Sequence, residues 1–245
     1  MSKKELKLGY LYPKLLNIYG DYGNVLILKK RCEWRDIDLI IDEINIGDRI
    51  SNHDMYFIGG GQDLQQIIVA KELQHNKSFF HEEMNNDTIF LSICGGYQLL
   101  GKYYQPYNGQ EIEGISLLES YTVAGEKRFI GNVTTQIHKD INLSVNTLVG
   151  FENHSGLTYL EGNTKPISTI ITGNGNNGED KTEGARYKNV FGTYMHGPFL
   201  SKNPHFADYL IGLSLYKKYG DTIKLKDIDD RDEFSAHYSL INKKY

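Results

Sequence analysis

Short apolar runs alternate with helix-like stretches over roughly the first hundred residues. The apolar runs read as strands and occupy residues 6–13, 37–44, 54–60 and 88–94. Between them, residues 23–35 and 64–74 show the apolar spacing of helices. This alternation predicts a mostly parallel sheet with helices on both of its faces.

The pattern changes from about residue 115 onward. Four strand-like segments separated by turns follow, at residues 115–123, 129–137, 146–153 and 166–172, and they predict an antiparallel extension. A buried strand at 189–197 and a helix at 206–220 complete the pattern. Because no linker interrupts the chain, residues 1–245 are expected to form a single domain.

The composition and charge of the chain restrict the classes of function that it could have. A hydrophobic fraction of 40%, a charged fraction of 24% and a formal charge of −4 are ordinary for a globular protein and argue against a nucleic-acid partner. The basic residues 29–31 are predicted to form a solvated helix face.

No segment has the roughly 18 consecutive apolar residues that a membrane span needs, and the amino terminus lacks a signal-peptide core. Two cysteines without metal-ligand spacing predict reduced thiols in the cytoplasm, no metal and no cofactor.

One of these cysteines lies in "LSICGGYQLLG", where an apolar strand meets two glycines and a helix. A turn at the carboxyl end of a parallel strand projects its residue into the ligand-binding crevice, and a helix amino terminus lowers a thiol pKa. Cys94 therefore fits a nucleophile elbow with Cys in place of Ser. The alternative is a buried cysteine that acts as a small hydrophobe, which is how we interpret Cys32 in the first helix.

A second glycine corner, "YFIGGGQD" at residues 56–63, also joins a strand to a helix. Exposed N–H groups in such a corner form an oxyanion or anion pocket, although a tight turn that needs positive φ is the simpler explanation. The spacing matches neither a Walker loop nor a dinucleotide-binding glycine motif.

A cysteine nucleophile needs a base, and the chain has eight histidines. His196 in "VFGTYMHGP" follows an apolar strand and would lie at the same sheet edge as Cys94, which fits a Cys–His pair. A lone histidine is more often structural. His154 in "GFENHSGLT" remains a possible supporting group.

Four segments, "SICGGYQLLG", "YFIGGGQD", "GFENHSGLT" and "GTYMHGPFL", together resemble the class I (triad) glutamine amidotransferases, in their cobyric-acid-synthase-like branch. Within that branch they are most similar to the glutaminase subunits of lipid II isoglutaminyl synthases. The likeness begins at "NIYGDYGN" and covers about four fifths of the chain. It implies a three-layer α/β/α sandwich and release of ammonia from glutamine through a cysteine thioester. It also implies a Mur-ligase-like (MurT-like) synthetase partner that binds ATP and lipid II and amidates the stem-peptide D-glutamate to D-isoglutamine.

The resemblance assigns roles position by position. Cys94 matches the nucleophile and His196 the general base. Gly60 or Gly61, together with Gly95, matches the oxyanion donors.

Arg128 in "AGEKRFIGN" matches the arginine that holds the glutamine substrate, and a guanidinium suits a carboxylate because it can bind both oxygens. The alternative for this residue is a surface charge on a strand edge.

The sequence departs from the family at the residue that orients the histidine. Many triad amidotransferases have a carboxylate two positions after the histidine, where this chain has Pro198. Glu152 and an acidic residue of the partner are the alternatives, and the second predicts that the isolated chain is a poor glutaminase. Two other functions stay open, namely a glutaminase for a corrinoid carboxylate and a binding protein with a dead site.

Overall fold

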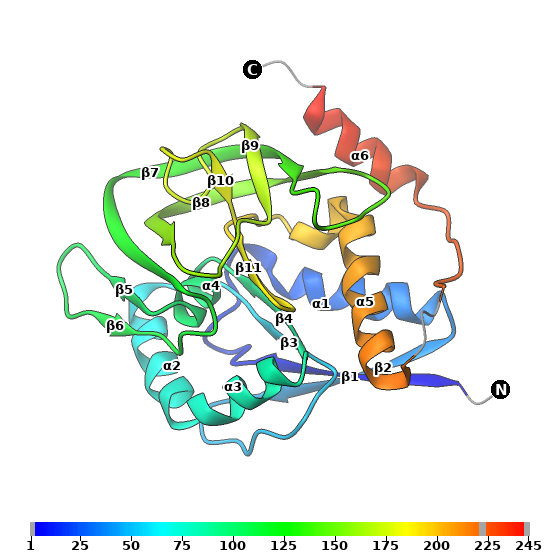
Figure 1. Ribbon diagram of the computed structural model, residues 1–245, viewed down its shortest axis with the longest axis horizontal. Helices are drawn as coiled ribbons and strands as arrows, with labels where there is room; N and C mark the ends of the chain where they lie inside the picture. Colours follow the sequence, from blue (N-terminus) through cyan, green and yellow to red (C-terminus); the bar gives the residue numbers. More distant parts are fainter. Residues whose placement is uncertain (1–2, 221–223, 243–245) are drawn as a thin grey trace.

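The computed structural model describes residues 3–220 and 224–242 (Figure 1). Its central sheet has six strands in the order β11-β12-β4-β3-β1-β2. All neighbours are parallel except the β11–β12 pair. The strands are β1 (Lys4–Leu11), β2 (Ile37–Ile44), β3 (Met55–Ile58), β4 (Ile89–Ile93), β11 (Ala185–Tyr187) and β12 (Val190–Thr193).

Helices connect these strands and cover the sheet. The connection from β1 to β2 contains α1 (Tyr22–Glu33), whereas β3 and β4 are joined through α2 (Asp63–His75) and α3 (Lys77–Asn85). These connections move in opposite directions across the sheet, so right-handed crossovers place α1 and the α2–α3 pair on opposite faces. Figure 1 shows α5 (Pro204–Tyr219) on the side of α1. The predicted mostly parallel α/β fold is confirmed.

A second, mostly antiparallel sheet forms the predicted extension, with the strand order β10-β9-β7-β5-β6 and with β8 paired to β7. The prediction of separate strands at 115–123 and 129–137 was wrong, because β7 runs unbroken through a register shift between Ala124 and Phe129. The strands are β5 (Tyr103–Gln105), β6 (Ile112–Glu113), β7 (Ser120–Ile137), β8 (Thr147–Leu160), β9 (Ser168–Thr172) and β10 (Thr182–Glu183).

Adjacent parallel strands bring three chain segments to one edge of the central sheet. Ile58 of β3 pairs with Ser92 of β4, and Thr193 of β12 pairs with Ile93. The residues that follow these three strands therefore emerge side by side. Strand β8 reaches the same edge, because Phe151 and His196 exchange two backbone hydrogen bonds of 2.9 and 3.2 Å.

The glycine corners after β3 and β4 pack directly on each other. A Cβ atom on Gly96, in the short helix α4 (Gly95–Leu100), would lie 2.7 Å from the carbonyl oxygen of Gly59 and 2.8 Å from that of Ile58. Both neighbours are backbone atoms that cannot rotate away. Glycine is thus required here by close approach of two main chains.

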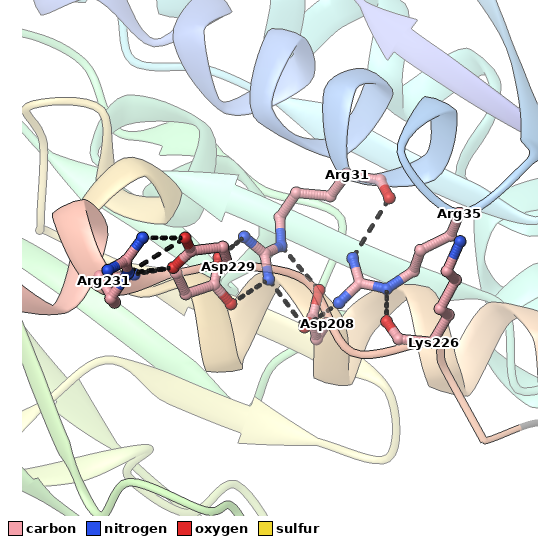
Figure 2. Close-up of polar contacts among 7 residues, drawn as sticks. Arg31, Arg35, Asp208, Lys226, Asp229 and Arg231 are labelled. Atoms are coloured by element: carbon pink, nitrogen blue, oxygen red, sulfur yellow. Dashed lines mark hydrogen bonds and ion pairs between the residues drawn. The ribbon is translucent and has the colours of Figure 1, made fainter.

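A buried ion-pair network ties α1 to α5 and to the chain beyond it (Figure 2). Arg31 is 1% exposed and donates to both carboxylate oxygens of Asp208 and both of Asp230, at 2.6 to 2.8 Å. Arg35 donates to Asp208 and to the carbonyl oxygen of Lys226. The expectation of a solvated basic face was therefore wrong for Arg31, because two acidic partners compensate for its burial.

Asp230 of this network lies directly before the last helix, α6 (Arg231–Ile241). His237 of α6 donates from Nδ1 to the carbonyl oxygen of Lys202, at 2.7 Å, and contacts the hydroxyl of Thr147 through Nε2. Lys202 lies in the 3-10 helix η2 (Phe199–Lys202), just after His196. Across residues 3–220 and 224–242 no helix is long and apolar enough to cross a bilayer.

Buried residues of both sheets belong to one continuous core cluster, from Leu6 of β1 through Val133 of β7 to Leu215 of α5. Such continuity suits the single domain that the sequence suggests, which stays a prediction for the full span 1–245. Three short segments of that span (1–2, 221–223 and 243–245) lie outside the described residues.

We expect Gly96→Ala to destabilise the protein by about 1–3 kcal/mol, because the added methyl group overpacks the contact between the two corners. Urea unfolding would measure the change. Gly212→Ala is the matched control, since Gly212 is also helical but a Cβ atom added there would have no neighbouring atom within 4 Å. This control should be neutral or slightly stabilising. Equal stabilities for the two variants would contradict the packing argument.

Candidate active site

Cys94 occupies a strained corner between β4 and α4. Its backbone has φ 50° and ψ −108°, a conformation that costs a non-glycine residue free energy and is held only by its surroundings. The Cys94 N–H donates to the carbonyl oxygen of Thr193, at 2.8 Å. The residue lines a cavity of about 380 Å³, which is within the range of small-molecule sites.

The second cysteine does not contribute to this cavity. Cys32 is fully buried in α1, and burial raises the pKa of its thiol to about 12. This environment agrees with the interpretation of Cys32 as a structural residue.

His196 lies after β12, at the sheet edge where Cys94 emerges, and it is 1% exposed. Its Nδ1 bonds to the Oδ1 atom of Asp21 at 2.9 Å, and Asp21 is fully buried. Among the described residues, Nε2 has no partner at hydrogen-bonding distance and angle. The carboxylate therefore fixes one ring nitrogen and leaves the other available to a reactant.

The pKa of His196 follows from these neighbours. Burial lowers it, but the hydrogen bond to Asp21 and the interaction with the Cys94 sulfur outweigh burial and raise the pKa to about 10. The imidazole therefore holds a proton at neutral pH. A positively charged imidazolium near a thiol favours the thiolate.

Asp21 is the residue that the sequence analysis missed. The two alternatives for an orienting acid were Glu152 and a residue of the partner. The Glu152 carboxylate instead accepts hydrogen bonds from the backbone and side chain of Asn174 and from the N–H of Gly175, so it is excluded. Asp21 therefore bonds to the His196 ring from within the chain, and the alternative of a carboxylate from a partner stays a prediction.

Pro198, the departure from the family pattern, has a packing role. A Cβ atom on Gly23 of α1 would lie 2.1 Å from Cγ of Pro198. The proline ring thus rests on the first turn of α1, directly after Asp21. In addition, the side chain of Asn24 accepts a hydrogen bond from the N–H of Leu200, at 2.9 Å. These contacts bring the start of α1 to the histidine and so place a carboxylate there from a different part of the chain.

The predicted oxyanion donors separate into two groups. Gly60 donates its N–H to Oδ2 of Asp21, at 2.7 Å, so the prediction that it could serve as an oxyanion donor was wrong. Gly61 lines the cavity, and a Cβ atom on Gly95 would lie 2.9 Å from the Gly61 nitrogen. The N–H of Gly95 begins α4 and has no partner within the helix. Gly61 and Gly95 are therefore the backbone pair that the structure brings together beside Cys94.

Arg128 projects from the irregular part of β7 into the same cavity. Its Nε donates to Oδ1 of Asn153 at 2.6 Å, and its Nη2 donates to the hydroxyl of Tyr19 at 3.0 Å. The guanidinium is thus oriented by β8 and by the segment before α1. Arg128 is exposed, as the alternative of a surface charge on a strand edge expects, so its role in holding the substrate stays a prediction.

His154 lies in the cavity wall but is unsuited to act as a base. Its Nδ1 donates to the carbonyl oxygen of Gly156, and its ring stacks on Tyr194 with centroids 3.6 Å apart. Burial lowers the pKa of His154 to about 4, so the ring is neutral. The Tyr194 hydroxyl accepts a hydrogen bond from Gln98, another cavity residue that the sequence analysis did not single out.

Within the described ranges, no three His, Cys, Asp or Glu side chains gather in a way that could hold a metal ion. The chemistry that the cavity supports is nucleophilic attack by a thiolate, with an imidazolium and backbone N–H groups beside it.

Known proteins match this chain closely. Residues 7–204 match the CobB/CobQ-like glutamine amidotransferase domain. The chain is 41% identical to the lipid II isoglutaminyl synthase (glutamine-hydrolyzing) subunit GatD of Streptococcus pneumoniae, over 98% of this chain and 93% of the relative. It is 39% identical to the same subunit of Staphylococcus aureus, over 98% and 96% of the two chains. A probable cobyric acid synthase of Methanococcus maripaludis is 28% identical over 90% of this chain but only 46% of that protein.

Solved structures agree at the level of the fold. PurLQS from Thermotoga maritima has a TM-score of 0.57 at 14% identity, covering 88% of this chain and 97% of that chain. A glutamine amidotransferase from the same organism has a TM-score of 0.56 at 14% identity, covering 96% and 93%. Together with the family match, these findings confirm what the four motifs predict: the chain belongs to the CobB/CobQ-like glutamine amidotransferases.

Proposed function

We propose that this chain is the glutaminase subunit of a lipid II isoglutaminyl synthase. The observation that carries the proposal is the near full-length similarity, at 41% and 39% identity, to two relatives with that name. The cobyric acid synthase relative is less similar, and this chain spans less than half of its length. The site supplies glutamine hydrolysis, and acceptor activation belongs to another protein.

The proposed partner is a Mur-ligase-like (MurT-like) synthetase. It uses ATP to activate the α-carboxyl group of the D-glutamate in the lipid II stem peptide, and the ammonia released here converts that group to the amide of D-isoglutamine. The names of both relatives describe a subunit, which supports a partner of this kind. We place the reaction in the cytoplasm, where the two free cysteines stay reduced.

In the proposed mechanism, the Cys94 thiolate attacks the carboxamide carbon of glutamine while the thiol proton resides on His196. Asp21 holds Nδ1 of the imidazolium and leaves Nε2 free to move a proton. The negative charge that develops on the carboxamide oxygen is stabilised by the N–H groups of Gly61 and Gly95. Removing one such donor typically costs about 10²–10³ in turnover.

His196 then gives its proton to the departing nitrogen, and ammonia leaves with formation of a γ-glutamyl thioester on Cys94. A water molecule, deprotonated by the now neutral His196, hydrolyses the thioester and releases glutamate. Throughout the cycle, Arg128 holds the α-carboxylate of the substrate by charge and hydrogen bonding.

Two other functions are less well supported. A glutaminase that serves a corrinoid carboxylate is less well supported, because the cobyric acid synthase relative is 28% identical to this chain, against 41% and 39% for the two lipid II isoglutaminyl synthase subunits. A dead-site binding protein would have no reason to retain the strained Cys94 corner and the Asp21–His196 bond. A diazo-ketone analogue of glutamine would label Cys94 stoichiometrically in the enzyme and leave Cys32 unmodified.

We expect Cys94→Ala to abolish glutamine-dependent amidation of lipid II while ammonium-dependent amidation persists. The reason is that the substitution removes the nucleophile but leaves the synthetase partner intact. The assay uses the assembled complex with ATP and lipid II and detects the amidated product by mass spectrometry. Cys32→Ala is the control and should keep both activities.

Two results would count against this assignment. Glutamine-dependent product from the Cys94→Ala complex would show that the nucleophile lies elsewhere. A wild-type complex that releases ammonia from glutamine but never amidates lipid II would show that the acceptor is wrong.

We expect Asp21→Asn to lower the glutaminase kcat by about 10²- to 10⁴-fold with little change in KM, since an amide cannot hold the protonated Nδ1 in the required tautomer. It should also lower the pKa of His196, because the hydrogen bond to Asp21 raises that pKa. Steady-state ammonia release and a pH titration of the imidazole by NMR would measure both effects. Asp36→Asn, at an exposed position, is the control. A wild-type kcat for Asp21→Asn would remove Asp21 from the mechanism.

We expect Gly23→Ala to lower kcat at least about tenfold, because the added methyl group pushes the start of α1 away from Pro198 and moves Asp21 relative to His196. The glutamine KM should change less than kcat, since Gly23 is not among the cavity residues. The same rate assay measures the effect, with Gly212→Ala as a glycine control on a helix without a close neighbour. An unchanged kcat would mean that Asp21 is positioned independently of this contact.

A further inference from the structure

Tyr19 lies in the cavity wall in a conformation that needs an explanation. It is the middle residue of the 3-10 helix η1 (Ile18–Gly20), with φ 52° and ψ 27°, which is left-handed and unfavourable for a tyrosine. The residue is 48% exposed, so burial of an apolar ring does not account for the strain. A strained non-glycine residue at a site usually serves that site.

The residues on either side of Tyr19 hold this conformation in place. The N–H of Ile18 donates to the carbonyl oxygen of Gly60, and the side chain of Asn17 accepts from the N–H of Tyr22, at 2.9 Å. Asp21 is bonded to both His196 and Gly60. The backbone is thus fixed before and after Tyr19, and the tyrosine side chain is directed over the cavity.

The two ends of the side chain contact two different parts of the site. The ring packs edge-to-face against the His196 imidazole, with centroids 4.9 Å apart and an interplanar angle of 72°. The hydroxyl accepts the hydrogen bond from Nη2 of Arg128, at 3.0 Å. One half-exposed residue therefore touches both the proposed base, which follows β12, and the proposed carboxylate-binding group, which lies in β7.

We propose that Tyr19 is a positioning residue that links recognition of the substrate α-carboxylate to the catalytic histidine. Its hydroxyl turns the Arg128 guanidinium toward the cavity, so that a free α-carboxylate is required for tight binding. Its ring restricts the orientation of the imidazole and closes the cavity beside it. The proposal rests on glutamine hydrolysis at this site and goes beyond it by naming the residue that selects glutamine with a free carboxylate.

The hydroxyl and the ring are separable by substitution. Tyr19→Phe should raise the glutamine KM about fivefold or more at nearly constant kcat, because it removes only the hydrogen bond to a charged group. It should also reduce the preference for L-glutamine over L-glutaminamide, which lacks the carboxylate. Tyr19→Ala should lower kcat as well, since the ring beside His196 is then lost. Tyr22→Phe, in the same segment, is the matched control and should resemble wild type.

A double-mutant cycle with Arg128→Lys tests the connection directly. If the hydroxyl acts through the guanidinium, Tyr19→Phe should have almost no further effect on kcat/KM in the Arg128→Lys background. An equal loss in both backgrounds, or a wild-type KM and substrate preference for Tyr19→Phe, would overturn the proposal.

A binding measurement separates this proposal from the reaction itself. Calorimetry on the Cys94→Ala chain, with and without Tyr19→Phe, compares the affinities for L-glutamine and L-glutaminamide in the absence of turnover. We expect the preference for glutamine to shrink at least about threefold, and an unchanged preference would contradict the role of Tyr19. Absence of ammonia release by the wild-type complex would instead refute the glutaminase assignment.

Discussion

The carboxylate of Asp21 is the group on which the geometry of the site depends. Its two oxygens bond to different partners, Nδ1 of His196 and the N–H of Gly60, and it is fully buried. A buried carboxylate is costly unless it is paired and hydrogen-bonded, and here the His196 imidazolium and the Gly60 N–H supply the partners. The same group therefore sets the tautomer of the base and fixes the corner after β3, so that Gly61 reaches the cavity.

Much of the fold could be predicted because its strongest signals are local. The buried strands of a parallel sheet are apolar along their whole length, and the helices between them have their own period. Two features depended on contacts that the sequence does not show. The polar residues before Phe129 mark a register shift within β7 and not a turn. The helix α3 (Lys77–Asn85) was not predicted, because no glycine or proline separates it from α2.

The same distinction between local sequence signals and long-range contacts applies to the candidate site. Cys94 and His196 each follow an apolar strand, so a sheet with parallel strands brings them to one edge, and sequence alone was enough. Asp21 follows no apolar strand and lies in a polar turn before a helix, which is an ordinary place for aspartate; its one signal is the segment "NIYGDYGN", where the family likeness begins. A search for an acid near the histidine in sequence leads to Pro198 and Glu152, whereas the carboxylate comes from 175 positions away. The packing of Gly23 on Pro198 explains this placement, because it brings the start of α1 to the histidine.

Helix α1 connects this site to the end of the chain. Its first turn carries Gly23 and Asn24, which hold the segment after His196, and its last turn carries Arg31, which binds Asp208 of α5 and Asp230 before α6. The family match ends at residue 204, so both of these acidic residues lie beyond it. A helix that is held at both ends cannot shift along its axis without breaking a buried ion pair, which is strongly unfavourable. The chain beyond the family match therefore helps to fix the position of Asp21, although none of its described residues lines the cavity.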